Sequence, residues 1–147
     1  MEPVRSDMTT DRRTAVDLAK RLLVDSIWRT AKIEVDGVTF PDTQEIFDGR
    51  APEGMSVDDI VTVNNIKRAW RFLLENIDYP VDWQYIREYN RIIGEGLVRD
   101  AGRLREYGVR IGGTGWVPEI PAVESSQERV RGILEESEGE DTAMLLF

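Results

Sequence analysis

The sequence predicts a mainly α-helical fold with one β-hairpin, incomplete at its C-terminus. Apolar residues recur at helical spacing over most of the 147 residues, as they do on the buried faces of helices. Capping residues and Gly or Pro breaks separate these stretches. A single segment, residues 107–111, alternates in the way that a half-buried strand does.

Three helices are predicted in the first half of the chain. Each has apolar residues on one face. Gly37 ends the first helix at a turn, Pro41 opens the second, and Ser56 caps the third. The predicted ranges are 11–33, 41–47 and 57–77.

Two further helices are predicted in the second half, over residues 83–93 and 125–136. Asp82 is the N-cap of the first of these. Residues 97–105, which lie between them, are predicted to form either a short helix or a loop.

A β-hairpin is predicted after this segment. Residues 107–111 form its first strand, Gly112-Gly113-Thr114-Gly115 its turn, and Trp116-Val117 the start of the return strand. Pro118 and Pro121 then stop regular pairing. The glycine run lacks the Lys-Ser/Thr ending and the following helix of a phosphate-binding loop, so we interpret it as a turn.

The two ends of the chain differ in character. Residues 1–10 are polar and predicted to be a disordered tail, followed by a single, partial domain over residues 11–147. After the acidic stretch 135–141, residues 142–147 begin an apolar helix that is marginal alone. This segment either docks as a C-terminal anchor or indicates that the fold is cut short, and we expect the second.

Charge and composition exclude several functions. A net charge of −9, from 19 basic and 28 acidic residues, disfavours nucleic-acid binding. No apolar run approaches a membrane span, and there is no signal peptide or cysteine, so we expect a cytoplasmic protein without membrane contact. The absence of histidine removes the commonest general base and metal ligand. No catalytic residue and no metal site are predicted.

Few side chains stand out as candidate binding residues. Trp28, Trp70 and Trp83 lie on helices that need core residues, whereas Trp116 lies beside the hairpin turn and is expected to be exposed. Thr30 and Glu34 are four residues apart and share one helix face, where a local hydrogen bond is the ordinary interpretation.

Several segments, in order, resemble the N-terminal part of a Fic (Fido) domain, over residues 20–137. The hairpin and the Gly-x-Leu-Arg sequence at Gly102 to Arg105 are the most specific of them. The segments are 26–34, 63–69, 86–93, 101–105 and 109–118. Asn90 stands where many relatives have histidine.

The resemblance implies a helical scaffold from an enzyme family that transfers AMP from ATP to a hydroxyl of a target protein. The catalytic motif of that family, His-Pro-Phe-x-Asp/Glu-Gly-Asn-Gly/Lys-Arg-x-x-Arg, is absent from this sequence. We therefore expect the chain alone to be inactive and to bind no cofactor, although the complete family domain uses ATP and magnesium.

Two features of the family have counterparts here. The hairpin resembles the flap that docks a target protein by strand addition, which makes Arg110, Ile111, the 112–115 turn and Trp116 candidate target contacts. Thr30 and Glu34 match the anchors of an inhibitory helix motif, but Val35 replaces the expected Gly or Asn. The expected partner of Glu34 is an arginine of the missing Fic segment or of another chain.

An alternative interpretation needs no missing segment. The chain would then be a stand-alone acidic helical interaction protein, for example an antitoxin-like protein that inserts Glu34 into a separate Fic enzyme. A hydrolase that uses paired carboxylates is a third interpretation, but the sequence indicates no specific pair for it.

Overall fold

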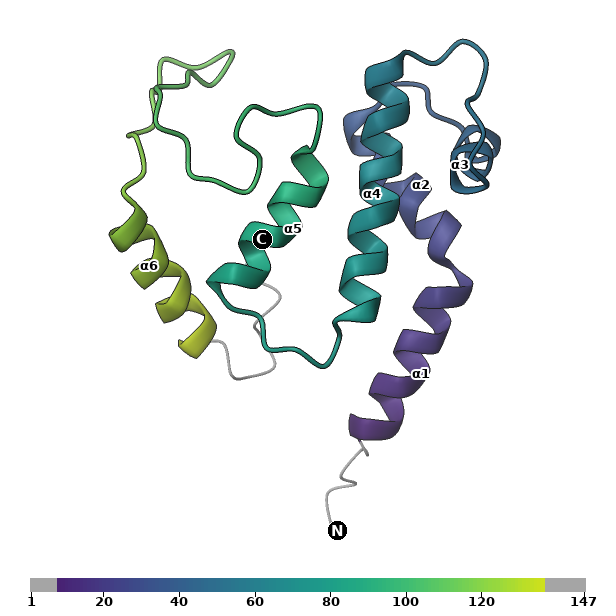
Figure 1. The fold of residues 1–147 in the computed structure, drawn as a ribbon, viewed down its shortest axis with the longest axis horizontal. Helices are drawn as coiled ribbons and strands as arrows, with labels where there is room; N and C mark the ends of the chain where they lie inside the picture. Colours follow the sequence, from purple (N-terminus) through teal and green to yellow (C-terminus); the bar gives the residue numbers. More distant parts are fainter. Residues whose placement is uncertain (1–7, 137–147) are drawn as a thin grey trace. The chain divides into compact units, whose positions relative to one another are not determined.

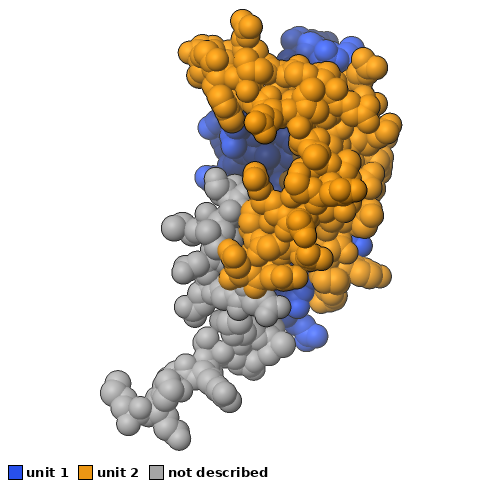
Figure 2. All heavy atoms as spheres, turned by 90° about the vertical axis from the view of Figure 1, so that its left-hand side faces the viewer, with its two compact units in different colours: residues 1–77 blue, residues 78–147 orange. Residues whose placement is uncertain are grey.

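A computed structural model describes residues 8–136, which contain six helices and no β-strand (Figure 1). The chain divides into two compact units, residues 1–77 and 78–147, which are coloured separately in Figure 2 and described here one at a time. In the described part, no helix has the length and apolar character needed to cross a membrane. A single domain over residues 11–147 stays a prediction.

The first predicted helix is two helices, α1 (Met8–Arg21) and α2 (Leu23–Glu34), that meet at Leu22. Leu22 has φ −97° and ψ 15°, outside the α-helical region. Hydrogen bonds of helical spacing continue on both sides, because Leu22 N donates to Leu18 O and Ser26 N donates to Leu22 O, each at 2.9 Å. The helical spacing of apolar residues also continues across Leu22. The sequence pattern therefore does not reveal the bend between α1 and α2.

The next two helices, α3 (Phe40–Phe47) and α4 (Val57–Glu75), begin at residues that cap them. Thr39 and Asp42 form a reciprocal capping box at α3, with bonds of 3.1 and 3.2 Å. The predicted cap Ser56 is confirmed, since its Oγ accepts the Asp59 N–H at 3.1 Å. Because the caps satisfy backbone groups at the helix starts, local sequence fixes where these helices begin.

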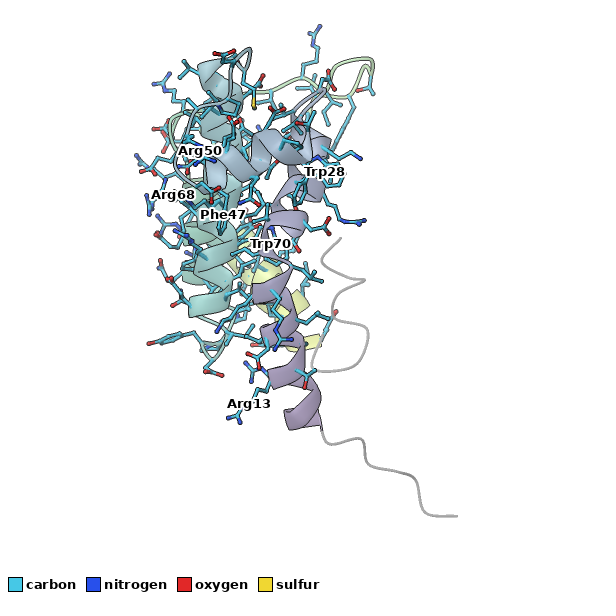
Figure 3. The ribbon with its side chains drawn as sticks, turned by 90° about the vertical axis from the view of Figure 1, so that its right-hand side faces the viewer. Arg13, Trp28, Phe47, Arg50, Arg68 and Trp70 are labelled. Atoms are coloured by element: carbon cyan, nitrogen blue, oxygen red, sulfur yellow. The ribbon has the colours of Figure 1, made fainter. Side chains whose placement is uncertain are left out.

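The core of the first unit lies between α2, α3 and α4. Ile27 and Val63 are among its fully buried side chains, together with the hydroxyl residue Thr43. Thr43 Oγ1 donates to Thr39 O at 3.0 Å, so its burial leaves no polar atom unsatisfied. Trp28 and Trp70, which were expected to be core residues, are half-buried; both are labelled in Figure 3. The buried apolar residues are Ile27, Ala31, Val35, Val38, Ile46, Val63, Ile66 and Ala69.

The second unit contains α5 (Trp83–Gly94) and α6 (Val123–Glu136), close to their predicted ranges. The predicted cap of α5 is confirmed, because Asp82 Oδ1 accepts the Tyr85 N–H at 2.8 Å. Among the described residues of this unit, only Ile92, Gly94 and Gly102 are buried. α6 buries none of its residues, so this unit has little core of its own.

The predicted β-hairpin at residues 107–117 is wrong. Within residues 107–120 the only backbone-to-backbone bond is a turn, in which Thr114 N donates to Ile111 O at 3.2 Å. Of the residues in this stretch, only Val109 and Pro118 are even half-buried, so the alternating pattern has no core to face. A two-stranded hairpin without a packed face is marginal in water, and the chain forms a loop instead.

Two other predictions meet different outcomes. Residues 97–105 form a loop rather than the alternative short helix. The apolar segment 142–147 lies outside the described residues.

Candidate functional site

Two regions of the structure hold the side chains that the sequence singled out. The first is the C-terminal end of α2, with Thr30 and Glu34. The second is the loop between Arg105 and Glu119, here called the 105–119 loop, which contains Arg110, the 112–115 turn and Trp116. The first belongs to the first unit and the second to the second unit, so each is described separately.

At the end of α2, the Thr30 side chain is hydrogen-bonded within the helix and not to Glu34. Thr30 Oγ1 donates to Ser26 O at 2.9 Å, a local bond within the helix. Glu34 is the last residue of α2 and is exposed, and its carboxylate has no ion pair or hydrogen bond in the described part of the chain. The local bond accounts for Thr30, whereas Glu34 presents an unpaired carboxylate to its surroundings.

The backbone around Glu34 is firmly held. Val35, which replaces the expected Gly or Asn, is 4% exposed and extended, with φ −121° and ψ 112°. Trp28 Nε1 donates to Val38 O at 3.2 Å and fastens α2 to the following turn. The ring of Phe40 packs edge-on against Trp28 at 5.7 Å. Valine at position 35 is thus a core residue, and Glu34 projects from a fixed helix end.

Arg105 closes the base of the 105–119 loop. Its Nη1 donates to Tyr107 O at 3.0 Å and its Nη2 donates to Glu119 O at 2.5 Å. These two bonds bring residues 107 and 119 to one guanidinium group without any strand pairing. One arginine side chain therefore holds together two backbone positions on either side of the segment predicted to form the hairpin.

The tip of this loop is a tight turn stabilised by Thr114. Its Oγ1 donates to Ile111 O at 3.0 Å and accepts the Trp116 N–H at 3.3 Å. Gly113 has φ +75°, which a residue with a side chain rarely adopts. Trp116 is 62% exposed, which confirms the prediction that it is the most accessible of the four tryptophans.

The segment that precedes this loop is hydrogen-bonded to α5 by residues that were not among the predicted site residues. Gly102 N donates to Asn90 Oδ1 at 2.9 Å, and Arg87 Nε donates to Gly102 O at 3.0 Å. Gly102 has φ +79°, and a Cβ placed there would lie 2.7 Å from the Cβ of Arg91. Asn90 therefore holds the loop on α5, and the polar side chains one helical turn apart at 87 and 90 were the available signal.

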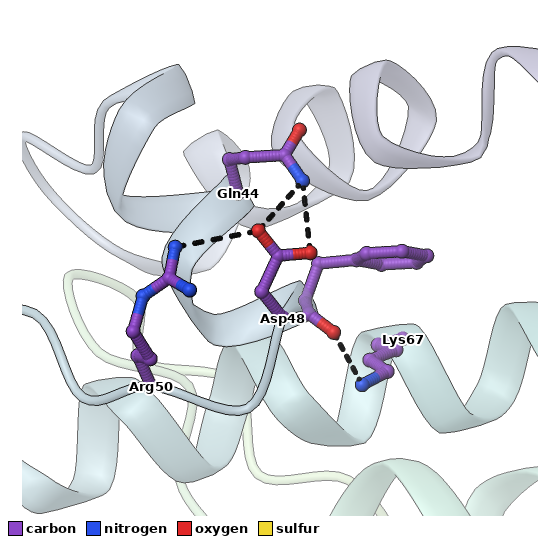
Figure 4. A network of polar contacts seen from close by, with 5 residues as sticks. Gln44, Asp48, Arg50 and Lys67 are labelled. Atoms are coloured by element: carbon purple, nitrogen blue, oxygen red, sulfur yellow. Dashed lines mark hydrogen bonds and ion pairs between the residues drawn. The ribbon is translucent and has the colours of Figure 1, made fainter.

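Lys67 of the first unit has a lowered pKa, which its packing between α3 and α4 explains. Lys67 Nζ donates to Phe47 O at 2.8 Å beside the network of Gln44, Asp48 and Arg50 (Figure 4). Partial burial, followed by the nearby charge of Arg71, lowers the pKa of Lys67 from its ordinary 10.5. Its ammonium lies 5.1 Å from the Phe47 ring centroid, and these contacts fasten α4 to α3.

The described residues bring together no set of three Asp or Glu side chains that could hold a metal ion. A groove of about 850 Å³ in the second unit is lined by none of the predicted site residues. No protein-family description matches the chain, and no curated protein and no solved structure matches it either.

Proposed function

We propose that this chain is the regulatory and target-docking part of a Fic-type protein adenylyltransferase that acts in the cytoplasm. The complete enzyme would transfer AMP from ATP, with magnesium, to a hydroxyl of a target protein. The 147 residues contain no histidine, the residue that acts as general base in the family motif, so the chain alone would be inactive. The observation that carries the proposal is the 105–119 loop.

This loop has the properties of a docking segment. Ile111, Trp116 and Val117 are exposed, at 41%, 62% and 54%. Arg110, which directly precedes Ile111 in the chain, is also exposed and adds a cation to this loop. Aromatic and arginine side chains contribute most to protein interfaces. A target would be recognised by these side chains and by the unpaired loop backbone, rather than by a preformed hairpin edge.

The end of α2 supplies the regulatory part of the proposal. Glu34 is an exposed carboxylate at a fixed helix end, and it has no ion-pair partner in the described residues. A carboxylate in that state is ready to bind an arginine from elsewhere, and Arg–carboxylate pairs are strong when bidentate. The arginine would come from the missing Fic segment.

The same observation favours a second candidate function. A stand-alone interaction protein could insert Glu34 into a separate Fic enzyme, as an antitoxin does. Co-purification with a second chain that contains the Fic motif would favour this alternative, and the 105–119 loop would then have no role in target docking.

The first experiment is to read the coding DNA downstream of the Phe147 codon in all three frames. The proposal expects a His-Pro-Phe…Gly-Asn…Arg segment there. Expressed with that segment, the chain should transfer labelled AMP from ATP to protein in a magnesium-dependent reaction.

Variants of the extended protein separate the two roles. Trp116→Ala should lower transfer to the target, and Glu34→Ala should raise it. Glu53→Ala, which removes another exposed carboxylate of the first unit, should change neither. Magnesium-dependent transfer by the purified 147-residue chain alone would contradict the proposal.

A further inference from the structure

A wide groove of about 850 Å³ in the second unit is lined by residues around the start of α5 and by residues of α6. Val81 and the N-cap Asp82, which precede α5, and Trp83, its first residue, are part of this lining. α6 contributes residues at relative positions 0, 3, 4, 7, 10 and 11, a spacing that puts them on a single helix face. They are Glu124, Gln127, Glu128, Arg131, Leu134 and Glu135.

α6 is incompletely packed in the described part of the unit. None of its residues is buried, and the apolar residues Val130, Ile133 and Leu134 are only half-buried. An amphipathic helix ordinarily buries its apolar face against a neighbour. The volume of the groove is within the range of sites that enclose a ligand, roughly 300–1,000 Å³. The groove is thus large enough to receive side chains of a further element alongside α6.

The walls of the groove are acidic. Four carboxylates line it, against the single guanidinium of Arg131. Arg131 Nη2 lies 3.7 Å from Glu128 Oε1, and Arg131 Nε lies 3.8 Å from Glu135 Oε1. The three side chains are 67%, 77% and 72% exposed, in the order Arg131, Glu128 and Glu135. Exposed pairs of this kind contribute little, so an incoming cation could compete for either carboxylate. The electrostatic field in the groove therefore favours a cationic occupant.

Apolar residues also line the groove. Trp83 and Leu134 are half-buried, and Val81 is 48% exposed. A lining that combines apolar residues with carboxylates matches a helix that has leucine-like residues on one face and lysine or arginine beside them.

We propose that this groove binds a basic amphipathic helix of a partner protein, with its apolar face on Trp83, Leu134 and Val81. Its lysines or arginines pair with Glu124, Glu128 and Glu135. The chain's own residues 137–147 are a poorer match, because Glu138, Glu140 and Asp141 would be repelled by the same walls. The inference stands apart from the Fic proposal, since no residue of the 105–119 loop and no residue of α2 takes part.

The test measures binding of two labelled synthetic peptides to the full-length chain by fluorescence anisotropy. One is an amphipathic helix of Leu and Lys, and the other has Glu in place of every Lys. We expect the Leu/Lys peptide to bind and the Leu/Glu peptide not to bind. Raising the salt concentration should weaken the binding, because exposed charge pairs are screened.

Variants locate the site. Glu128→Gln with Glu135→Gln should weaken binding of the Leu/Lys peptide about fivefold or more, given two exposed charge pairs. Val81→Ser should weaken binding of the same peptide, because it removes an apolar side chain from the lining of the groove. Asp36→Asn with Glu53→Gln, which remove the same net charge from exposed positions of the first unit, should leave binding unchanged. Circular dichroism melts check that each variant is folded.

Several results would overturn the inference. Equal binding of the two peptides, or equal effects of the two charge-removing pairs, would show that no specific groove is involved. Binding that appears only after Leu145→Asp with Phe147→Asp would identify the chain's own C-terminal segment as the occupant. Concentration-dependent dimerisation that Glu128→Gln with Glu135→Gln abolishes would identify a second copy instead.

Discussion

The two units are both helical, but they are stabilised in different ways. In the first unit, α2, α3 and α4 surround eight buried apolar residues. In the described part of the second unit, Ile92 is the only large apolar side chain that is buried. In place of an apolar core, this unit has side chains that form hydrogen bonds to backbone groups. Asn90 and Arg87 bond to the backbone of Gly102, and Arg105 bonds to the carbonyl oxygens of Tyr107 and Glu119.

The difference bears on where binding surfaces occur. Burial of apolar area stabilises a domain by about 25 cal/mol per Å², so the first unit has the larger reserve of stability. The second unit leaves apolar residues such as Trp116, Val117 and Ile120 exposed. Large exposed apolar patches mark interaction sites, and both the 105–119 loop and the acidic groove belong to this unit.

The largest expected effect is in the core of the first unit. Ile27→Ala should lower the free energy of unfolding by about 4 kcal/mol, because Ile27 is 1% exposed and truncation leaves a cavity. Ile33→Ala, on the same helix but 79% exposed, should change it by less than about 0.5 kcal/mol. Urea unfolding followed by circular dichroism measures both. Similar costs for the two variants would contradict the assignment of the core.

Gly102→Ala should have the next largest effect and is the counterpart in the second unit. The new Cβ would lie 2.7 Å from Arg91 Cβ and 3.0 Å from Arg87 O, at a residue with φ +79°. Overpacking and left-handed strain together should cost about 3 kcal/mol.

Gly113→Ala is the matched control for this prediction. Gly113 has a similar φ of +75° but open space around it, so the cost should be about 1 kcal/mol. Equal costs for the two variants would mean that the loop is not seated on α5 as described.

Helix caps give a comparison in which the two units should respond alike. Ser56→Ala at α4 and Asp82→Ala at α5 each remove one side chain that accepts a backbone N–H, and each should cost about 1 kcal/mol. Urea unfolding again measures the change. A much larger cost at Asp82 would show that the second unit depends on local hydrogen bonds even more than its thin core indicates.

The sequence predicted the helices of both units well, and the reason is local. Ser56, Asp82 and Pro41 act through neighbouring backbone groups, so their roles can be inferred without knowing what the helix packs against. The bend at Leu22 leaves no such mark, because the apolar spacing continues through it.

The prediction of the hairpin was wrong because a strand depends on the rest of the fold rather than on local residues. Alternation at residues 107–111 predicts a strand only if one face of the strand becomes buried, and burial depends on the rest of the fold. The glycine-rich run at residues 112–115 did identify a turn correctly. The bonds that replace strand pairing come from Arg105, whose partner Glu119 is 14 residues away, and no local pattern predicts such a pair.

Arg105→Ala should have a local effect rather than a global one. Loss of the two bonds to Tyr107 O and Glu119 O should open the 105–119 loop by about 1 kcal/mol while leaving the unfolding of the helices nearly unchanged. Trypsin should then cleave after Arg110 about fivefold faster, since cleavage follows the population of the open form. Arg103→Ala, another exposed arginine near the loop, should leave that rate as it is. Unchanged cleavage in Arg105→Ala would contradict the closing role of Arg105.

The smallest expected effect concerns Tyr89, because it depends on the partial burial of one face of α5. Burial raises the pKa of Tyr89 above its ordinary value of 10.0. Between pH 10.0 and that raised value, the unfolded chain releases the phenol proton while the folded chain retains it. The folded state then binds more protons, so stability falls as pH rises through this window.

The comparison that tests this is Tyr89→Phe against the unchanged chain, with urea midpoints measured at one pH below 10.0 and one above it. The variant should lose less stability on going to the higher pH, because phenylalanine has no proton to release. Burial raises the pKa of Tyr85 in the same direction, so part of the fall should persist in the variant. An identical fall in both proteins would mean that Tyr89 is hydrated, and that the second unit shields even less of α5 from water than the structure indicates.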